Sequence, residues 1–343
     1  MKSLKPTLLS ILAILAILAA APAFACDLCA CYTPRLAVVP DKTYGFYGGA
    51  AEQFTYFGTD RQNGKEVANP TGQYMASSNT QLFLGVTFFN NRAGVQFNVP
   101  LIYRSYKRPE GFDIERGHVS GIGDVSLLAN WVVFKKESYP QESVTSKDGK
   151  SSALVQGATP DFSTSLNLIA GLKFPTGDSS RLAEEFHEVE VEGAPESGIH
   201  GHDLALGTGS YDGVFGAQFS VRYKAVFFQA DAQFTWRGMG SHSYRYANDF
   251  IWSAGPGVYL VRNAASSLAL IGVVSGETKG LDTFLGQPAA DSGITSLYLG
   301  PAIVGTYGRF SGQVGVDLPV LMNTTAFQTT PDYRIRAGFA IQF

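Results

Sequence analysis

The chain has 343 residues, with 26 basic against 29 acidic side chains, which gives a formal net charge of −3 at pH 7. This mildly acidic balance argues against a nucleic acid as the partner. Beyond the N-terminal region, no apolar stretch approaches the roughly 20 residues that a membrane helix requires, so the sequence also excludes a helical membrane protein.

Residues 1–25 have the pattern of a secretory signal peptide. Two lysines precede an apolar run over residues 8–20, and small residues follow up to Ala25, which ends an A-x-A cleavage site. Cleavage after Ala23 is an alternative, and lipid attachment to Cys26 is another, because a lipoprotein needs a cysteine at its first mature position. Removal of the two lysines leaves 24 basic against 29 acidic residues, a net charge of −5.

The mature chain begins with a short segment, residues 26–42, that we expect to lie in the periplasm. It holds all three cysteines of the chain, Cys26, Cys29 and Cys31. An oxidising compartment favours one disulfide with a spare thiol. Three neighbouring thiolates are also suited to Cu(I) or Zn(II), so disulfide, metal and lipid all remain open for this segment.

The rest of the chain, residues 43–343, alternates between apolar and polar side chains with the period of a β-strand. The predicted strands are 43–58, 79–89, 92–106, 122–135, 162–174, 204–223, 224–237, 248–262, 265–275, 294–306, 309–321 and 332–343. The last one is the most informative, because its apolar parity runs from Tyr333 to Phe343 while Arg334 and Arg336 occupy the other parity. A chain that ends on an exposed phenylalanine is typical of outer-membrane barrels, so we interpret Phe343 as an assembly signal.

This pattern predicts an all-β fold, a transmembrane antiparallel outer-membrane β-barrel of about 12 strands. Its 38 glycines, 16 tyrosines and 24 phenylalanines suit a barrel that bends and carries aromatic girdles. Short and long connections alternate, which places both termini in the periplasm. Residues 136–161 break the rule and are interpreted as a disordered or semi-ordered insertion. A soluble β-sandwich is the alternative, disfavoured by the signal peptide, the charged strand faces and the terminal phenylalanine.

Several short motifs punctuate the predicted strands. They are Phe97-Asn-Val-Pro-Leu101, Gly121-Ile-Gly-Asp-Val125, Lys173-Phe-Pro-Thr-Gly-Asp178 and Gly207-Thr-Gly-Ser-Tyr-Asp212. With these motifs in this order, residues 43–343 resemble the outer-membrane barrel family known as putative components of the meta-pathway of phenol degradation, or simply as transporters. The resemblance implies a barrel that takes up small aromatic compounds.

The polar parity of the predicted strands assigns ten charged residues to the barrel lumen. They are Arg104, Asp124, Lys173, Arg222, Asp231, Arg237, Asp249, Asp317, Arg334 and Arg336. Charged rings of this kind select permeants in pores. Alternatively, the charges pair with one another and fill a narrow interior.

The five histidines all fall in predicted external loops or strand rims, and His200-Gly-His202 is the sharpest local pattern. In an extended chain the two imidazoles would face one side and could hold one divalent ion together with Asp203. Divalent ions could also bridge the carboxylates of residues 184–192 to lipopolysaccharide. The alternative is a solvated acidic loop with freely titrating histidines.

The sequence contains no pattern typical of an enzyme, because no serine–histidine pair has an orienting acid on a strand. No cofactor is expected apart from a possible divalent metal. The leading hypothesis is therefore a channel or transporter of the bacterial outer membrane for small solutes, passive or weakly selective. Its expected partners are the outer membrane with its lipopolysaccharide, the barrel-assembly machinery and a small-molecule solute. The alternative functions are a plugged barrel that binds a metal or a partner through residues 176–203 and the N-terminal cysteines, and a purely structural surface barrel or adhesin.

Overall fold

The computed structural model describes most of the region expected to form the barrel. The described residues are 45–145, 152–156, 160–187, 191–263 and 265–343. The expectations for the signal peptide and for Cys26, Cys29 and Cys31 lie outside these residues.

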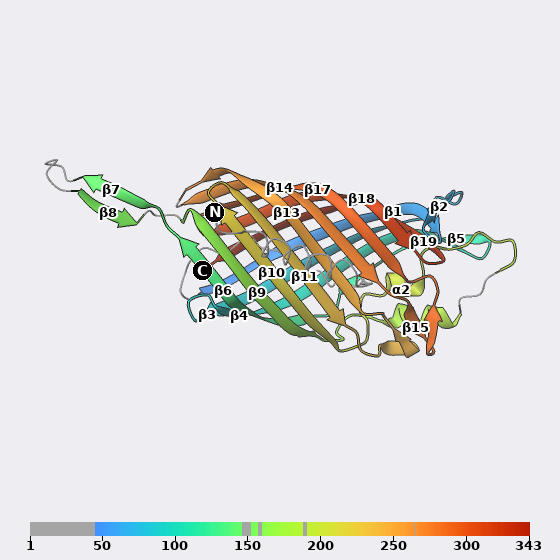
Figure 1. Ribbon diagram of the computed structural model, residues 1–343. Coiled ribbons are helices and arrows are strands. Elements are labelled where there is room, and N and C mark those ends of the chain that lie inside the picture. The colour runs from blue at the N-terminus through green and yellow to red at the C-terminus, as the bar shows by residue number, and fades with distance from the viewer. Residues whose placement is uncertain (1–44, 146–151, 157–159, 188–190, 264) are drawn as a thin grey trace, which may run out of the picture.

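Within the described residues, twelve long antiparallel strands close into a barrel (Figure 1). They are β1 (Gly45–Gln62), β3 (Tyr74–Phe88), β4 (Ala93–Glu110), β6 (Ser126–Ser138), β9 (Phe162–Lys173), β10 (Asp212–Tyr223), β11 (Val226–Trp236), β13 (Asp249–Arg262), β14 (Ser266–Lys279), β17 (Ile294–Tyr307), β18 (Phe310–Thr324) and β19 (Phe327–Gln342). Each strand pairs with its neighbours in the chain order, and β19 pairs with β1 to close the cylinder. A closed barrel leaves none of these strands with an unpaired edge.

Shorter elements decorate the two ends of the barrel. They are β2 (Lys65–Glu66), β5 (Asp113–Ile122), β7 (Gln141–Thr145), β8 (Ser152–Gln156), η1 (Ser180–Phe186), α2 (Gly201–Leu204), η2 (Ser241–Ser243), β12 (Tyr244–Arg245), β15 (Asp282–Phe284) and β16 (Gln287–Ala289). Figure 1 shows β7 and β8 extending from the end of the barrel at which the chain terminates, whereas β2, β5, α2 and β15 lie at the opposite end. We call these the terminal end and the loop end. No helix in the described part of the chain is long and apolar enough to cross a membrane.

The alternating apolar and polar side chains of the sequence point to the outside and the inside of the barrel, respectively. Along β19 and at the residue that follows it, Phe339 and Phe343 are 57% and 60% exposed, whereas Arg334 and Gln342 are 6% and 3% exposed. A single-layered wall can bury a side chain in this way only on its inner face. The barrel therefore has an apolar outer surface and a polar interior, the reverse of a soluble β-sandwich, as expected for a membrane barrel.

Each predicted strand overlaps one barrel strand, so the predicted fold class and strand number are confirmed. The predicted strand 204–223 is wrong in its first part, because Gly201–Leu204 form a helical turn and β10 begins only at Asp212. The predicted loops 107–121 and 276–293 contain strand as well, where β4 pairs with β5 and β15 pairs with β16. The insertion 136–161 contains a further hairpin, in which β7 pairs with β8.

The connections at the terminal end are mostly tight turns, as predicted. Asn90 and Asn91 have φ values of 55° and 60°, and Gly308 has a φ of 57°. Asparagine and glycine tolerate this left-handed conformation, which two-residue hairpins require. One connection at the loop end is also short, because β18 runs on to Thr324 and turns through Ala326.

Candidate functional site

The interior of the barrel is the candidate site, and the chain itself occupies much of its loop end. The segment between β9 and β10, residues 174–187 and 191–211, folds inward and carries η1 and α2 (Figure 1). We call this segment the inner loop. Its Ile199 and Leu204 are buried against Phe57, Met75 and Tyr106 of the barrel wall. A loop lying on the outer rim would leave such side chains exposed, so the inner loop fills part of the bore.

Seven of the ten residues predicted to face the lumen are buried inside the barrel. They are Arg104, Asp124, Lys173, Arg237, Asp249, Asp317 and Arg334. The other three, Arg222, Asp231 and Arg336, are partly buried on the same inward parity. Most of them interact with charges of opposite sign, which favours the alternative in which interior charges pair with one another.

The strongest of these interactions form a chain of ion pairs along the wall. Lys173 Nζ lies 3.1 Å from Asp124 Oδ2 and 2.8 Å from Asp212 Oδ2. Arg237 continues the chain, with Nη1 2.9 Å from Asp212 Oδ2 and Nε donating to Asp249 Oδ2 over 2.8 Å. All five side chains are almost completely buried, so the loss of one partner would leave an uncompensated charge at a cost of about 3–5 kcal/mol.

This charge network also anchors the inner loop. Asp124 accepts hydrogen bonds from the backbone N–H of Gly177 at 2.9 Å and of Thr208 at 2.8 Å. The backbones of Gly177 and Gly207 meet at this point, because a Cβ on Gly207 would lie 2.6 Å from the carbonyl oxygen of Gly177. Three of the four sequence motifs thus converge on one place in the fold, although they are far apart in the chain.

Contacts from other parts of the wall hold the inner loop across the bore. Arg104 on β4 donates from Nη1 to the carbonyl oxygens of Asp203 and Ala205, both at 2.7 Å. The hydroxyl of Tyr246 donates to the carbonyl oxygen of His202 at 2.7 Å. On the β19 side, the N–H of Thr329 donates to the carbonyl oxygen of Gly198 at 2.9 Å. These contacts come from β4, from the connection between β12 and β13, and from β19, so the inner loop bridges the lumen.

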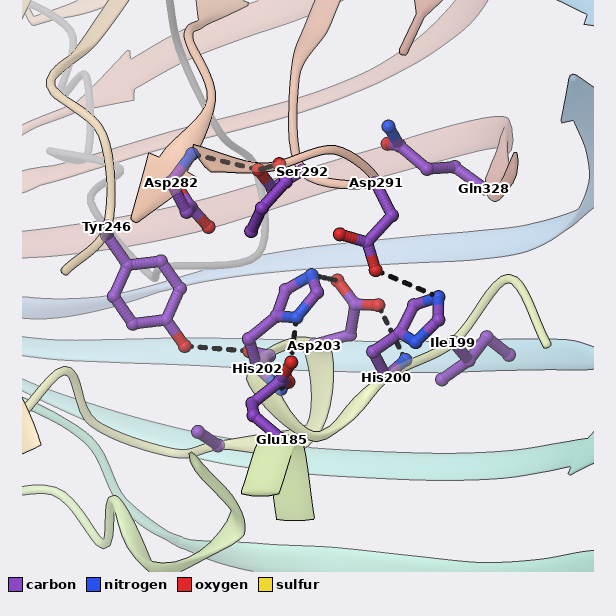
Figure 2. A network of polar contacts seen from close by, with 12 residues as sticks. Glu185, Ile199, His200, His202, Asp203, Tyr246, Asp282, Asp291, Ser292 and Gln328 are labelled. Carbon is purple, nitrogen blue, oxygen red and sulfur yellow. Dashed lines mark hydrogen bonds and ion pairs between the residues drawn. The ribbon is translucent and has the colours of Figure 1, made fainter. Parts of the chain in front are cut away.

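A polar cluster lies where the inner loop meets the loop end (Figure 2). Nδ1 of His202 is 2.9 Å from Oε1 of Glu185, and its Nε2 is 3.5 Å from Oδ1 of Asp203. His200 stacks on His202 with 5.5 Å between ring centroids, and its Nε2 lies 3.2 Å from Oδ2 of Asp291. The cluster joins η1, α2 and the connection that follows β16.

The electrostatics of this cluster favour a charged pair. Burial disfavours the imidazolium of His202, but the carboxylates of Asp203 and Glu185 outweigh burial and raise the pKa of His202 well above its usual value. Burial likewise acts to raise the pKa of Glu185, but His202 lowers it to about 2. At neutral pH the two groups therefore form an ion pair in the interior of the protein.

The geometric reason for expecting a metal ion here is wrong. His200 and His202 do not share one side of an extended chain, because His200 is the N-cap of α2 and His202 lies within its helical turn. Nδ1 of His202 is occupied by Glu185. Among the residues that the structure describes, no group of three or more histidine, cysteine, aspartate or glutamate side chains is arranged to hold a metal ion.

The remaining interior charges also have partners, except near the terminal end. Arg334 Nη2 lies 2.9 Å from Glu277, and Arg336 Nε lies 2.7 Å from Asp317. Asp231 accepts a hydrogen bond of 3.3 Å from Ser253. Arg222 donates to the backbone carbonyl oxygen of Pro160 at 2.8 Å.

Sequence reasoning missed several interior residues, above all Asp212, Glu185 and Glu277. Asp212 belongs to one of the recognised motifs, and its parity within β10 is the same as that of Arg222. That parity could have assigned it to the lumen. Glu185 carries no such signal, because its role depends on how η1 and α2 pack together.

Comparisons with known proteins agree with this architecture. The structure matches the COG4313 outer membrane channel from Pseudomonas putida F1 with a TM-score of 0.57 at 14% identity, over 91% of this chain and all of that one. It also matches the β domain of the Bordetella autotransporter BrkA, with a TM-score of 0.42 at 10% identity, over 86% of this chain and 99% of that one. No family model and no curated sequence matches the chain.

The fold places the chain in a defined class. It is a closed twelve-stranded antiparallel β-barrel of the outer-membrane type. Within that class, its architecture is similar to that of the channel from Pseudomonas putida F1.

Proposed function

We propose that the protein is a channel of the bacterial outer membrane that passes small solutes, either passively or with weak selectivity. The observation that carries this proposal is a closed barrel whose outer face is apolar and whose interior buries charged side chains. A wall of this kind separates an aqueous path from lipid. The structural likeness to a protein described as an outer membrane channel supports the same function.

The inner loop narrows the path through the barrel. Twelve strands enclose a slim lumen, and the side chains of Ile199 and Leu204 fill part of it. We propose that the loop limits passage to small solutes and that it lies on the external side, next to lipopolysaccharide. The short turns and Phe343 then lie on the periplasmic side, where the assembly machinery would read the final strand.

Planar-bilayer recording of the refolded protein tests the proposal. We expect small, stepwise conductances in KCl, and larger steps when residues 179–206 are replaced by a short glycine–serine linker. Retention of the compact barrel is checked by its heat-modifiable migration in gels. If both folded proteins leave the bilayer resistance unchanged, the protein is not a channel.

A further inference from the structure

Two arginines converge inside the terminal end of the lumen. Arg222 on β10 donates from Nη1 to the carbonyl oxygen of Pro160 at 2.8 Å, and Arg262 on β13 donates from Nη2 to the same oxygen at 3.0 Å. The two donor nitrogens therefore lie within about 6 Å of each other. Each guanidinium has five N–H donors, and among the described residues one shared carbonyl accepts only one of them from each arginine.

The carboxylates near these two arginines form no direct ion pair with them within the described structure. The carboxylates that face it are those of Glu137 and Asp161. Glu137 is held by Lys135, 3.2 Å away, and by the hydroxyl of Tyr139 at 3.1 Å. Among the described residues, neither arginine forms an ion pair with a carboxylate, in contrast to Arg237, Arg334 and Arg336 at the other interior positions.

Two aromatic side chains, Phe227 and Tyr259, lie between the two arginines. Arg222 is the cross-strand partner of Phe227, and Phe227 in turn pairs with Gly257 on β13. The ring of Phe227 covers Gly257, where a Cβ would lie 2.2 Å from the ring. The centroids of Phe227 and Tyr259 are 4.9 Å apart, and the guanidinium of Arg262 lies 5.8 Å from the centroid of Tyr259.

We propose that Arg222 and Arg262 form an anion-binding site at the terminal end of the lumen. Its ligand is a small organic carboxylate whose apolar part lies against Phe227 and Tyr259. Guanidinium groups bind carboxylates through paired, charge-assisted hydrogen bonds, and two adjacent cations repel each other until an anion lies between them. The inference deepens the proposed function, since it gives the channel a preference for organic anions.

Binding of hexanoate to the folded, detergent-solubilised protein, measured by calorimetry, tests the site. We expect the double variant Arg222→Gln/Arg262→Gln to weaken binding by roughly tenfold or more, since two charge-assisted contacts are lost. Lys224→Gln is the matched control, because it removes a positive charge from the adjacent turn, where Lys224 lies over the exposed ring of Tyr223. That control should bind hexanoate as the wild type does.

A second probe separates the apolar contact from the charge. Inorganic phosphate carries the anionic oxygens without an apolar body, so the wild type should bind it more weakly than hexanoate. Equal binding of the two probes overturns the assignment to organic carboxylates. Unchanged hexanoate binding by the folded double variant overturns the site itself. Arg262→Lys, which keeps the charge but loses the planar fork, should bind with intermediate affinity and serves if the double variant does not fold.

Electrophysiology tests the proposed anion site and the proposed channel function separately. In a KCl gradient, the reversal potential of the double variant should shift toward cations relative to the wild type. If hexanoate binding depends on the arginines but the protein shows no conductance, the proposed channel function is refuted and the anion site is supported. If the protein conducts but its hexanoate binding is the same without both arginines, the anion site is refuted and the channel function is supported.

Discussion

The variant Glu185→Gln should open the lumen more often, because it removes the charge that holds His202, and with it α2, against η1. Glu185 accepts hydrogen bonds of 2.9 Å from both Nδ1 and the backbone N–H of His202. Glutamine keeps an acceptor oxygen for the backbone N–H but cannot balance the imidazolium. The substitution therefore isolates the charge from the shape of the side chain.

The expected size follows from the pKa of Glu185, which falls from 4.5 to about 2. Each pKa unit corresponds to about 1.4 kcal/mol, so the ionised form gains on the order of 3 kcal/mol from its surroundings. The side chain is 8% exposed, so solvent screens this interaction little. If the contact is lost when α2 moves away from η1 and out of the bore, the ratio of open to closed channels rises on the order of a hundredfold.

Single-channel recording measures this ratio directly as the open probability. Glu192→Gln provides the control, because Glu192 lies in the same loop with an exposed side chain. An open probability that is the same in Glu185→Gln and in the wild type, with both barrels folded, would refute the assignment of the Glu185–His202 pair as a closing contact.

The charge network and the pH dependence give further predictions. Asp124→Asn should destabilise the folded barrel by about 3 kcal/mol, measured by urea unfolding, since it leaves Lys173 with less compensation. Gly207→Ala should displace the inner loop and raise conductance, because its Cβ would meet the backbone of Gly177; a conductance like that of the wild type would contradict this. The pKa of His202 lies above its unfolded value of 6.5, so its contribution to closure is complete below pH 6.5 and is lost as the pH rises through the folded value. Glu185 contributes fully above pH 4.5 and loses its contribution as the pH falls from 4.5 to about 2, so open probability should be flat between pH 5 and 6.5 and should rise as the pH increases above 6.5.

The strands were predictable because their signal is local. Alternation along β19 from Tyr333 to Phe343 needs no knowledge of any other segment, and the burial of Arg334 against the exposure of Phe339 follows from it directly. A strand in a closed barrel has the same two environments along its length, so no tertiary contact overrides the pattern.

The inner loop was not predictable in the same way, because its environment is set by distant residues. Leu204, Leu206 and Ser210 alternate with smaller residues as a strand would, yet Leu204 is buried in a helical turn against Phe57 and Met75. Once a loop folds into the lumen, buried apolar side chains no longer report strand parity. The two arginines of the proposed anion site show how far strand parity can be used. Arg222 was assigned to the lumen by its parity. Arg262 could not be assigned in this way, because it follows a bulge between Tyr259 and Val261 that shifts the register.

The contacts of the inner loop differ in strength along its length, and this determines which part opens first. The amides of Gly177 and Thr208 donate to Asp124, which belongs to the buried charge network of the wall. The amides of His200 and His202 donate instead to carboxylates within the loop itself. A wall anchor resists any movement of the loop, whereas the bonds of His202 to Glu185 resist only the movement of α2 away from η1.

Opening should therefore begin as a displacement of α2 away from η1, about fixed ends near Gly177 and Thr208. The wall holds η1 itself, because Arg108 on β4 lies 2.9 Å from Glu184. This displacement must break the Glu185–His202 pair and the packing of Leu204. It must also break the bonds of Arg104 to the carbonyl oxygens of Asp203 and Ala205, and the bond of Tyr246 to the carbonyl oxygen of His202. Native-state hydrogen exchange distinguishes the two parts, since locally opening units exchange before the anchored structure. The amides of Gly177 and Thr208 should be the slower pair; faster exchange there than at His200 and His202 would place the hinge elsewhere.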